Sequence, residues 1–314
     1  MHAVLSVLLP IFGLILAGFV CGRQDWLGPG ATDSLNRFVV RLALPAELFQ
    51  SMAQVTRAQI DHPAFVAAFA GGMLATFGLG FLLDYRRPVD RAHRISGAAI
   101  EGLAAGYANT AFIGIPLCLG VFGPAGLPPV VLATLMTVCA LFALAIALVE
   151  LDQQAGHGLS RTLAKVAIAL LRNPLVAAPI AGMAVNLSGF GLGAPVLRFT
   201  GLLGDAASPC ALVTIGLFLA ETRGGSASVF AVARVVMAKL LLQPLLTALL
   251  AFPVLRLESL WAEAAVLIAA LPVGTGPFML ARLYRREADV ASRATLISTV
   301  LSLVTVSLLL DWIG

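Results

Sequence analysis

The chain has 314 residues, of which 60% are hydrophobic and only 11% are charged. Soluble domains carry about 25% charged residues, so this composition excludes a soluble globular protein and indicates an integral membrane protein surrounded by lipid bilayer. The net charge of +4 does not indicate a nucleic-acid partner, because arginines at the borders of membrane helices account for it.

Ten apolar stretches, each long enough for the roughly 20 residues of a membrane helix, are predicted to span the bilayer. They lie at residues 3–21, 35–54, 63–83, 96–121, 128–150, 165–187, 199–220, 229–252, 258–281 and 290–312. The connections between them are short, and none has the length of a soluble domain. The sequence therefore predicts an all-α membrane protein whose single domain covers residues 1–314.

The basic residues of the connections fall mainly on one side of the predicted membrane. Twelve follow odd-numbered spans, namely Arg23, Arg86, Arg87, Arg91, Arg94, Arg161, Lys165, Arg223, Arg282, Arg285, Arg286 and Arg293. The other side holds three, Arg57, Arg198 and Arg256. Basic residues favour the cytoplasm, so both termini are predicted to be periplasmic. Heavy use of alanine and glycine, with two lysines among 20 basic residues, is typical of a GC-rich bacterium, which indicates a multi-pass protein of the inner (plasma) membrane.

Two of the ten stretches contain glycine and proline near their middle. Gly114 and Pro116 interrupt the fourth, and Gly274 and Pro277 interrupt the ninth. Proline removes a backbone donor, and in lipid an unsatisfied backbone group costs several kcal/mol, so such breaks persist only where they face protein or a wet cavity. Paired breaks at corresponding positions of two halves indicate a transporter's binding site, whereas the structural alternative is a pair of kinks made for packing.

The two halves of the chain repeat weakly. Leu9-Pro10 resembles Ala178-Pro179, Leu44-Pro45 resembles Ser208-Pro209, and the two broken stretches resemble each other in the same order. We expect a first repeat at residues 1–150, a second at residues 165–314 and a short cytoplasmic connection at residues 151–164. Five spans per half is an odd number, so the repeats would lie in opposite membrane orientations, as in secondary transporters.

Two motifs resemble the auxin efflux carriers and their bacterial relatives, which include malonate permeases. The motifs are Asn109-Thr110-x-x-x-Gly114-Ile115-Pro116-Leu117 and Ala270-Leu271-Pro272-x-Gly274-x-x-Pro277-Phe278-x-x-Ala281-x-x-Tyr284. The resemblance implies a fold like that of the bile-acid sodium symporters, with a scaffold from spans one, two, six and seven. It also implies a transport domain with crossed broken helices four and nine, which carries a carboxylate substrate by an elevator-like movement.

The expected substrate-binding residues surround the two breaks. A broken helix presents N–H groups equivalent to roughly +0.5 charge at the start of its second half, which binds anions without a basic side chain. The Asn109 amide can donate to a carboxylate, although it can instead cap the freed carbonyls of its own break. The expected set is Asn109, Thr110, Gly114, Pro116, Gly274, Thr275 and Pro277.

Two charged residues lie deep in predicted spans, where ionisable groups are expected to be functional. Lys239 in span eight could supply a positive charge that replaces a coupling ion, or it could form an internal ion pair or reach toward an interface. Glu47 in span two is the deepest acid. The four cysteines show no paired spacing, so neither a metal site nor a cofactor is expected.

These observations predict a secondary transporter of small organic carboxylate anions, with elevator-type movement. A sodium-coupled symporter of the bile-acid type is the alternative within the same class, but no acid lies between Phe65 and Leu83 in span three to bind a cation. An anion channel or a non-transporting receptor is the alternative from another class. The four histidines lie at span ends or in connections, which argues against an intramembrane enzyme. Both a monomer and a homodimer remain open.

Overall fold

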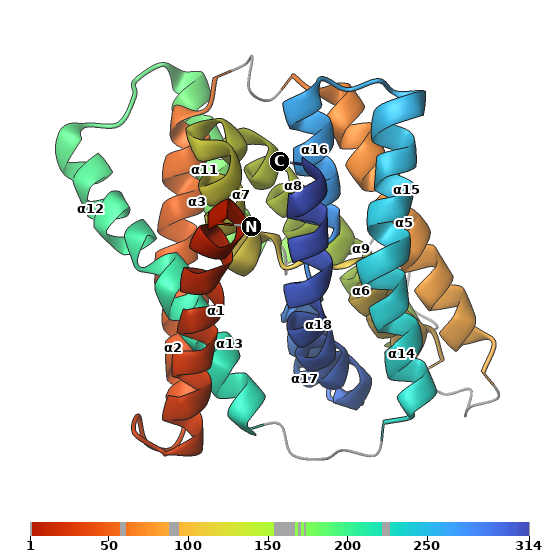
Figure 1. Cartoon of the computed structure of the whole chain (residues 1–314). Coiled ribbons are helices and arrows are strands. Elements are labelled where there is room, and N and C mark those ends of the chain that lie inside the picture. Colours follow the sequence, from red (N-terminus) through yellow and green to blue (C-terminus); the bar gives the residue numbers. More distant parts are fainter. Residues whose placement is uncertain are drawn as a thin grey trace. The chain divides into compact units, whose positions relative to one another are not determined.

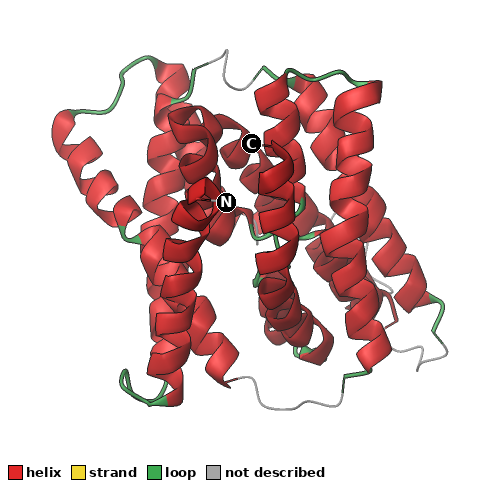
Figure 2. Ribbon diagram, viewed as in Figure 1, coloured by secondary structure: helices red, strands yellow, loops and turns green. Residues whose placement is uncertain are grey.

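The computed structural model describes residues 2–56, 61–87, 94–153, 167–168, 171–172, 174–221 and 227–313. Almost all of these residues are helical, and none of them belongs to a strand (Figure 2). Many large apolar side chains are exposed, including Leu9, Leu187 and Leu308, each more than 60% exposed. An aqueous surface rarely carries so much apolar area, whereas a bilayer accepts it. The prediction of an all-α membrane protein is confirmed for the described residues.

Figure 1 shows the helices in chain order. The first half contains α1 (His2–Arg23), α2 (Ala31–Phe38), η1 (Val39–Ala43), α3 (Leu44–Gln54), α5 (Pro63–Tyr85), α6 (Arg94–Gly106), η3 (Thr110–Gly114), α7 (Ile115–Phe122), η4 (Gly123–Gly126), α8 (Leu127–Leu135), η5 (Met136–Leu141) and α9 (Phe142–Gln153). The second half contains α11 (Pro174–Ser188), α12 (Ala194–Asp205), α13 (Ala207–Glu221), α14 (Val229–Met237), η6 (Ala238–Leu242), α15 (Gln243–Leu249), η7 (Leu250–Val254), α16 (Ser259–Ala269), α17 (Gly276–Leu283) and α18 (Asp289–Ile313).

Within the described residues, five helical runs are long and apolar enough to cross a membrane on length and composition alone. They are Pro63–Tyr85, Thr110–Gln153, Ala194–Glu221, Val229–Val254 and Asp289–Ile313. The ten-span count and the inverted repeat stay predictions. The predicted connection 151–164 lies outside the described residues from residue 154 onward, as do several basic residues used to predict the orientation: Arg57, Arg91, Arg161, Lys165 and Arg223.

Three prolines each follow a π-helical segment at the same offset. Pro45 follows η1, Pro116 follows η3 and Pro244 follows η6. A proline cannot donate to the carbonyl four residues earlier, and a local widening of the helix accommodates that missing bond without ending the helix. The expectation that Gly114 and Pro116 break the fourth stretch is therefore wrong, because helix runs from Thr110 to Phe122 and the interruption lies at residues 107–109.

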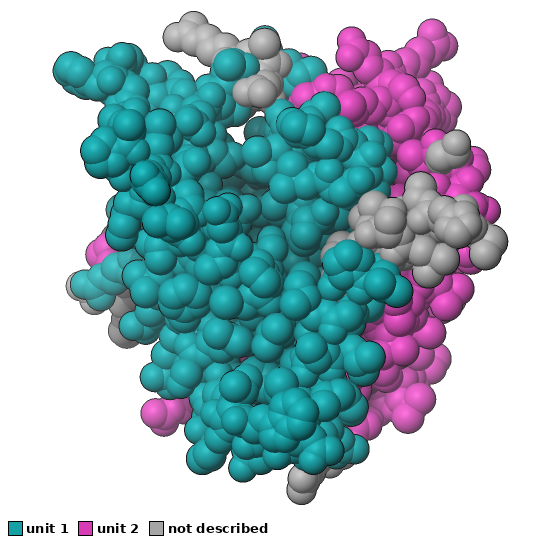
Figure 3. All heavy atoms as spheres, turned by 60° about the vertical axis from the view of Figure 1, so that its left-hand side comes forward, with its two compact units in different colours: residues 1–62, 111–135, 171–223 teal, residues 63–110, 136–170, 224–314 magenta. Residues whose placement is uncertain are grey.

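The chain divides into two compact units (Figure 3). The first unit comprises Met1–His62, Ala111–Leu135 and Leu171–Arg223. In it α1 packs along α13, and α3 packs on α11 and α12. A Cβ added at Gly216 would lie 2.0 Å from the Ile15 carbonyl oxygen, so only glycine permits this approach of α1 and α13.

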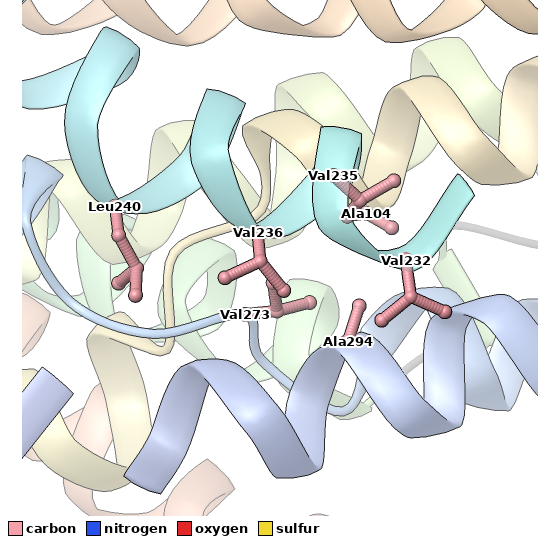
Figure 4. Packing of buried hydrophobic residues seen from close by; sticks show 7 residues of the cluster. All are labelled: Ala104, Val232, Val235, Val236, Leu240, Val273 and Ala294. Atoms are coloured by element: carbon pink, nitrogen blue, oxygen red, sulfur yellow. The ribbon is translucent and has the colours of Figure 1, made fainter. Parts of the chain in front are cut away.

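The second unit comprises Pro63–Thr110, Met136–Leu170 and Gly224–Gly314. In it α5 packs along α6, α14 packs on α18, and α15 packs on both α5 and α16. A cluster of buried side chains joins three of these helices to the residues between α16 and α17 (Figure 4). It consists of Ala104, Val232, Val235, Val236, Leu240, Val273 and Ala294. The cluster fixes a non-helical stretch inside the unit.

Candidate functional site

Two helix interruptions lie against each other inside the second unit. Residues 107–109 separate α6 from η3, and residues 270–275 separate α16 from α17. Ala108 and Val273 form an antiparallel bridge, in which the Asn109 N–H donates to the Pro272 carbonyl at 2.9 Å and the Gly274 N–H donates to the Tyr107 carbonyl at 3.0 Å. We call these two stretches and their bridge the crossing. Each break satisfies part of the other's exposed backbone, which lipid could not do.

Helix α18 satisfies further backbone groups of the crossing. The Ser298 hydroxyl accepts a hydrogen bond from the Val273 N–H at 3.0 Å. The Thr295 hydroxyl shares its proton between the Ala291 carbonyl of its own helix, at 2.9 Å, and the Gly274 carbonyl, at 3.3 Å. Both side chains are fully buried. Sequence reasoning missed these two residues. The row Thr295, Ser298, Thr299 and Ser302, polar at helical spacing in an apolar stretch, is the signal that could have found them.

The Asn109 amide is a buried donor at the crossing. The residue is 4% exposed, and Nδ2 has no hydrogen-bond partner within the described part of the chain. Asn109 lies next to the residues that precede α17, because a Cβ built on Gly274 would be 3.3 Å from the Asn109 Cα. Leaving a buried donor unpaired costs about 1–3 kcal/mol. If Asn109 capped the freed carbonyls of its own break, its Nδ2 would donate hydrogen bonds to them, and it makes none to the described residues.

The Tyr107 ring covers the start of α17. A Cβ on Gly274 would lie 2.8 Å from ring carbons Cδ1 and Cε1, and a Cβ on Gly276 would lie 2.6 Å from Cζ. The ring also meets Phe142 edge to face, with centroids 6.2 Å apart. The glycines on either side of Thr275 are therefore required by the ring of Tyr107, a residue that sequence reasoning did not single out.

The first turn of α17 carries two more expected residues. Half-buried Thr275 precedes the helix, and its carbonyl accepts the Met279 N–H at 3.0 Å. Pro277 lies in the first turn, where the lack of an N–H costs no intrahelical bond. The other N–H groups of a first turn have no partner within their own helix and carry partial positive charge. The buried Asn109 amide and this helix start are thus neighbouring donor groups.

The two helices that precede the interruptions, α16 and α6, end against polar side chains of the α14–η6–α15 helix. Lys239 is completely buried, and its Nζ donates to the carbonyl of Ala269, the last residue of α16, at 2.6 Å. Gln243, also completely buried, donates from Nε2 to the carbonyl of Gly106, the last residue of α6, at 3.3 Å. The ion pairs of the described residues do not include Lys239.

The remaining expected residues lie in the first unit. Gly114 and Pro116 belong to it, as does Glu47 on α3, whose Oε2 is buried without a partner in the described residues. Glu47 packs beside Gly204 of α12. Asn109, Thr110, Gly274, Thr275, Pro277 and Lys239 all belong to the second unit. Thr110 is buried at the start of η3.

A resident metal has no evident ligand set in the described part of the chain. No three side chains among its histidines, cysteines, aspartates and glutamates are grouped to hold an ion. The four cysteines are free thiols.

Comparison with known proteins shows the family of this chain. A family model described as "Membrane transport protein" matches residues 3–310. The chain is 30% identical to the "Putative malonate transporter" of Rhizobium meliloti (strain 1021), over 99% of this chain and 96% of the relative. It is 28% identical to an "Uncharacterized transporter" of Methanothermobacter thermautotrophicus, over 98% and 96% of the two chains. It is 26% identical to the "Uncharacterized transporter YfdV" of Escherichia coli (strain K12), over 84% and 83%.

The family match covers nearly the whole chain, including both interrupted stretches that form the crossing. The relatives that match over most of their length are named transporters. The chain therefore belongs to the membrane transport protein family, the auxin efflux carrier family that its two glycine- and proline-containing motifs resemble.

Proposed function

We propose that this protein is a carrier that moves small organic carboxylate anions across the bacterial inner membrane. The observation that carries the proposal is the unpartnered, buried amide of Asn109 beside the start of α17. The name of the malonate-related relative supports the same class of substrate. A carboxylate is an acceptor-only group, so it would complete the bond that Nδ2 lacks.

The crossing offers an anion hydrogen-bond donors that do not depend on a basic side chain. Donors from the first turn of α17, from the Thr275 hydroxyl and from Asn109 could share one carboxylate group. Bonds to a charged acceptor are shorter and roughly twice as strong as bonds between neutral groups. A low-dielectric protein interior strengthens them further, so few donors suffice to hold the anion.

An elevator-type movement is supported by the way the crossing is built. Helices α6, α16, α17 and α18, which form or fix it, all belong to the second unit. Movement of that unit as one body would carry the crossing without dismantling it, whereas Gly114 and Pro116 of the expected set belong to the first unit. In this proposal the first unit, with α1, α3, α11 and α13, is the scaffold of the predicted ten-span inverted repeat, with both termini periplasmic.

We further propose that transport is uniporter-like or proton-linked rather than sodium-coupled. With a negative cytoplasm, moving one charge yields or costs about 2.3 kcal/mol per 100 mV, so an anion leaves downhill without a coupling ion. Import would need co-transported cations and carboxylates to bind them. Along α5 the only acid is Asp84, which lies near its end and pairs with Arg87 at 3.2 Å.

The proposal is tested first by binding and then by transport. Purified protein would be heated with malonate, other small mono- and dicarboxylates, and neutral amide analogues of the same size. Stabilisation by the acids and not by the amides is expected. In proteoliposomes, unlabelled substrate inside should accelerate uptake of labelled substrate. Absence of such counterflow, with flux intact, would mean a channel; binding without flux would mean a receptor.

A further inference from the structure

The second unit contains a cavity that shares no lining residue with the crossing. It has a volume of about 390 Å³ and lies among α5, α6 and the α14–η6–α15 helix, which pack on one another. Pockets that hold small molecules have volumes of about 300–1,000 Å³. The lining is apolar except for two residues, Glu101 and Arg234.

The apolar part of the lining combines buried small residues with exposed large ones. Gly80, Ala105 and Ala238 are buried, whereas Met237 and Leu245 are 57% and 67% exposed. Large apolar side chains that are exposed on a membrane span face the hydrocarbon of the bilayer. The cavity is therefore a groove that opens toward lipid, and a hydrocarbon chain inside it gains dispersion contacts with the small residues.

The charged end of the groove is a chain of ion pairs that joins α6, α14 and the end of α5. The carboxylate of Glu101 accepts from Arg87 Nη1 at 3.2 Å and from Arg234 Nη2 at 3.0 Å. Arg87 also pairs with Asp84, at 3.2 Å. Two guanidinium groups share the Glu101 carboxylate, and Asp84 pairs with Arg87, so Arg234 is only partly neutralised.

Arg234 keeps hydrogen-bond donors for a further anion. A guanidinium has five N–H donors, and within the described residues only Nη2 of Arg234 donates to Glu101. The Arg234 side chain is 18% exposed and lines the groove. The planar fork of arginine matches the geometry of phosphate oxygens. The groove thus joins a phosphate-binding group to an apolar surface.

The length of the groove matches one leaflet of a bilayer. On the α14–η6–α15 helix its lining runs from Arg234 to Leu245, a rise of roughly 16 Å. Half of the hydrocarbon core of a bilayer is about 15 Å thick. Arg234 lies in the second turn of α14, and Asp84 lies in the last turn of α5, so the charged end is at the level where the spans end and the headgroups begin.

We propose that this groove binds one membrane phospholipid. The lipid phosphate accepts hydrogen bonds from Arg234, and one acyl chain lies along the α14–η6–α15 helix toward Leu245. The same helix carries Lys239 and Gln243, which bond the ends of α16 and α6, so the lipid contacts the helix that braces the crossing. The proposal does not depend on the substrate of the carrier.

The test counts the lipids that bind to the purified, delipidated protein by native mass spectrometry. Dioleoyl-phosphatidylethanolamine and dioleoylglycerol are supplied at equal mole fractions in detergent micelles, because they share their acyl chains and differ in the phosphate headgroup. The parent protein should bind one phospholipid about tenfold or more tightly than the diacylglycerol.

Two variants separate the headgroup contact from the apolar groove. Arg234→Gln should bind both lipids about equally, because the phosphate loses its charged donor. Ala238→Phe places a ring in the groove and should weaken the binding of both lipids by about tenfold or more. If Ala238→Phe does not fold, Leu241→Trp, which also fills the groove, takes its place in the titration.

Ala233→Phe and Arg198→Gln are the matched controls. Ala233 is exposed on the same helix outside the groove, and Arg198 is an exposed arginine of α12 in the first unit, so both variants should bind the phospholipid as the parent does. A parent that binds both lipids equally, or a filled groove with parental affinity, would overturn the proposal. A parent that binds neither lipid would also overturn it and would leave the groove to another occupant, such as a helix of a second copy.

Discussion

Asn109 donates its backbone N–H to the carbonyl of Pro272 at 2.9 Å, and this bond joins two helix breaks that lie in different halves of the sequence. The main chain of Asn109 is thereby fixed while its side-chain Nδ2 remains without a partner in the described residues. A residue whose backbone is structural and whose side chain is unsatisfied can be truncated without disturbing the crossing.

Asn109→Ala should weaken carboxylate binding and leave stability nearly unchanged. Its Nδ2 gives up no bond within the protein, whereas the loss of a bond to a charged acceptor costs about 1.5–3 kcal/mol, or about 10- to 150-fold in dissociation constant. Binding would be measured by isothermal titration and stability by thermal unfolding.

Asn186→Ala is the matched control for this substitution. The Asn186 Nδ2 donates to the carbonyls of Ala53 and Val55, at 2.9 and 2.8 Å, within the first unit. Its removal should lower the free energy of unfolding by about 1–3 kcal/mol and leave affinity intact. If the two variants behave alike, Asn109 has no special role in binding.

Gly276→Ala should destabilise the protein through a clash with Tyr107. The new Cβ would lie 2.6 Å from the ring, and overpacking of this kind costs about 1–3 kcal/mol. In the double variant with Tyr107→Ala the clash is absent. The double variant should therefore lose less free energy of unfolding than the two single variants do together, by roughly 1–2 kcal/mol.

Gly78→Ala, in the interior of α5, is the control, because nothing lies within 4 Å of the added Cβ. It should be neutral or stabilising by about 0.5–1 kcal/mol. If chemical denaturation shows that the effects of Gly276→Ala and Tyr107→Ala are additive, the ring of Tyr107 is not the reason for glycine at position 276.

Pro116→Ala should change the register of the helix that follows Asn109 and should not close the break. With an N–H restored at residue 116, the wide η3 turn can tighten to ordinary α-helix, which rotates residues 110–114 relative to α7. We expect carboxylate affinity to fall about tenfold or more, with helix content unchanged by circular dichroism. A variant with parental affinity would show that the π-helical register is irrelevant to binding.

Ser298→Ala should destabilise the crossing. The serine hydroxyl accepts the Val273 N–H at 3.0 Å, and a buried N–H without a partner costs about 1–3 kcal/mol. Ser307→Ala on the same helix removes an exposed hydroxyl bonded only to its own helix, at the Leu303 carbonyl, and should change the free energy of unfolding by less than about 0.5 kcal/mol. Equal losses in thermal unfolding would contradict the role assigned to Ser298.

The sequence by itself determined the class of protein and the neighbourhood of the candidate site. Low charge and long apolar stretches exclude a fold that is surrounded by water alone. Asn109 and Gly274 were also within reach of sequence reasoning, because glycine, proline and amide groups inside apolar runs are costly without a purpose. The family follows from the same residues.

Only the tertiary structure decided where the fourth stretch breaks and what holds the breaks together. Proline is a sign of an irregular helix, but neighbours can accommodate it, and at Pro116 a π-helical turn does so while the interruption lies at residues 107–109. The partners Ser298, Thr295 and Gln243 come from helices distant in sequence. Lys239 could be recognised as deep from the sequence, yet its position at the Ala269 carbonyl depends on how α16 packs against the helix that carries it. Local patterns encode which groups lack partners, whereas packing determines which distant groups supply them.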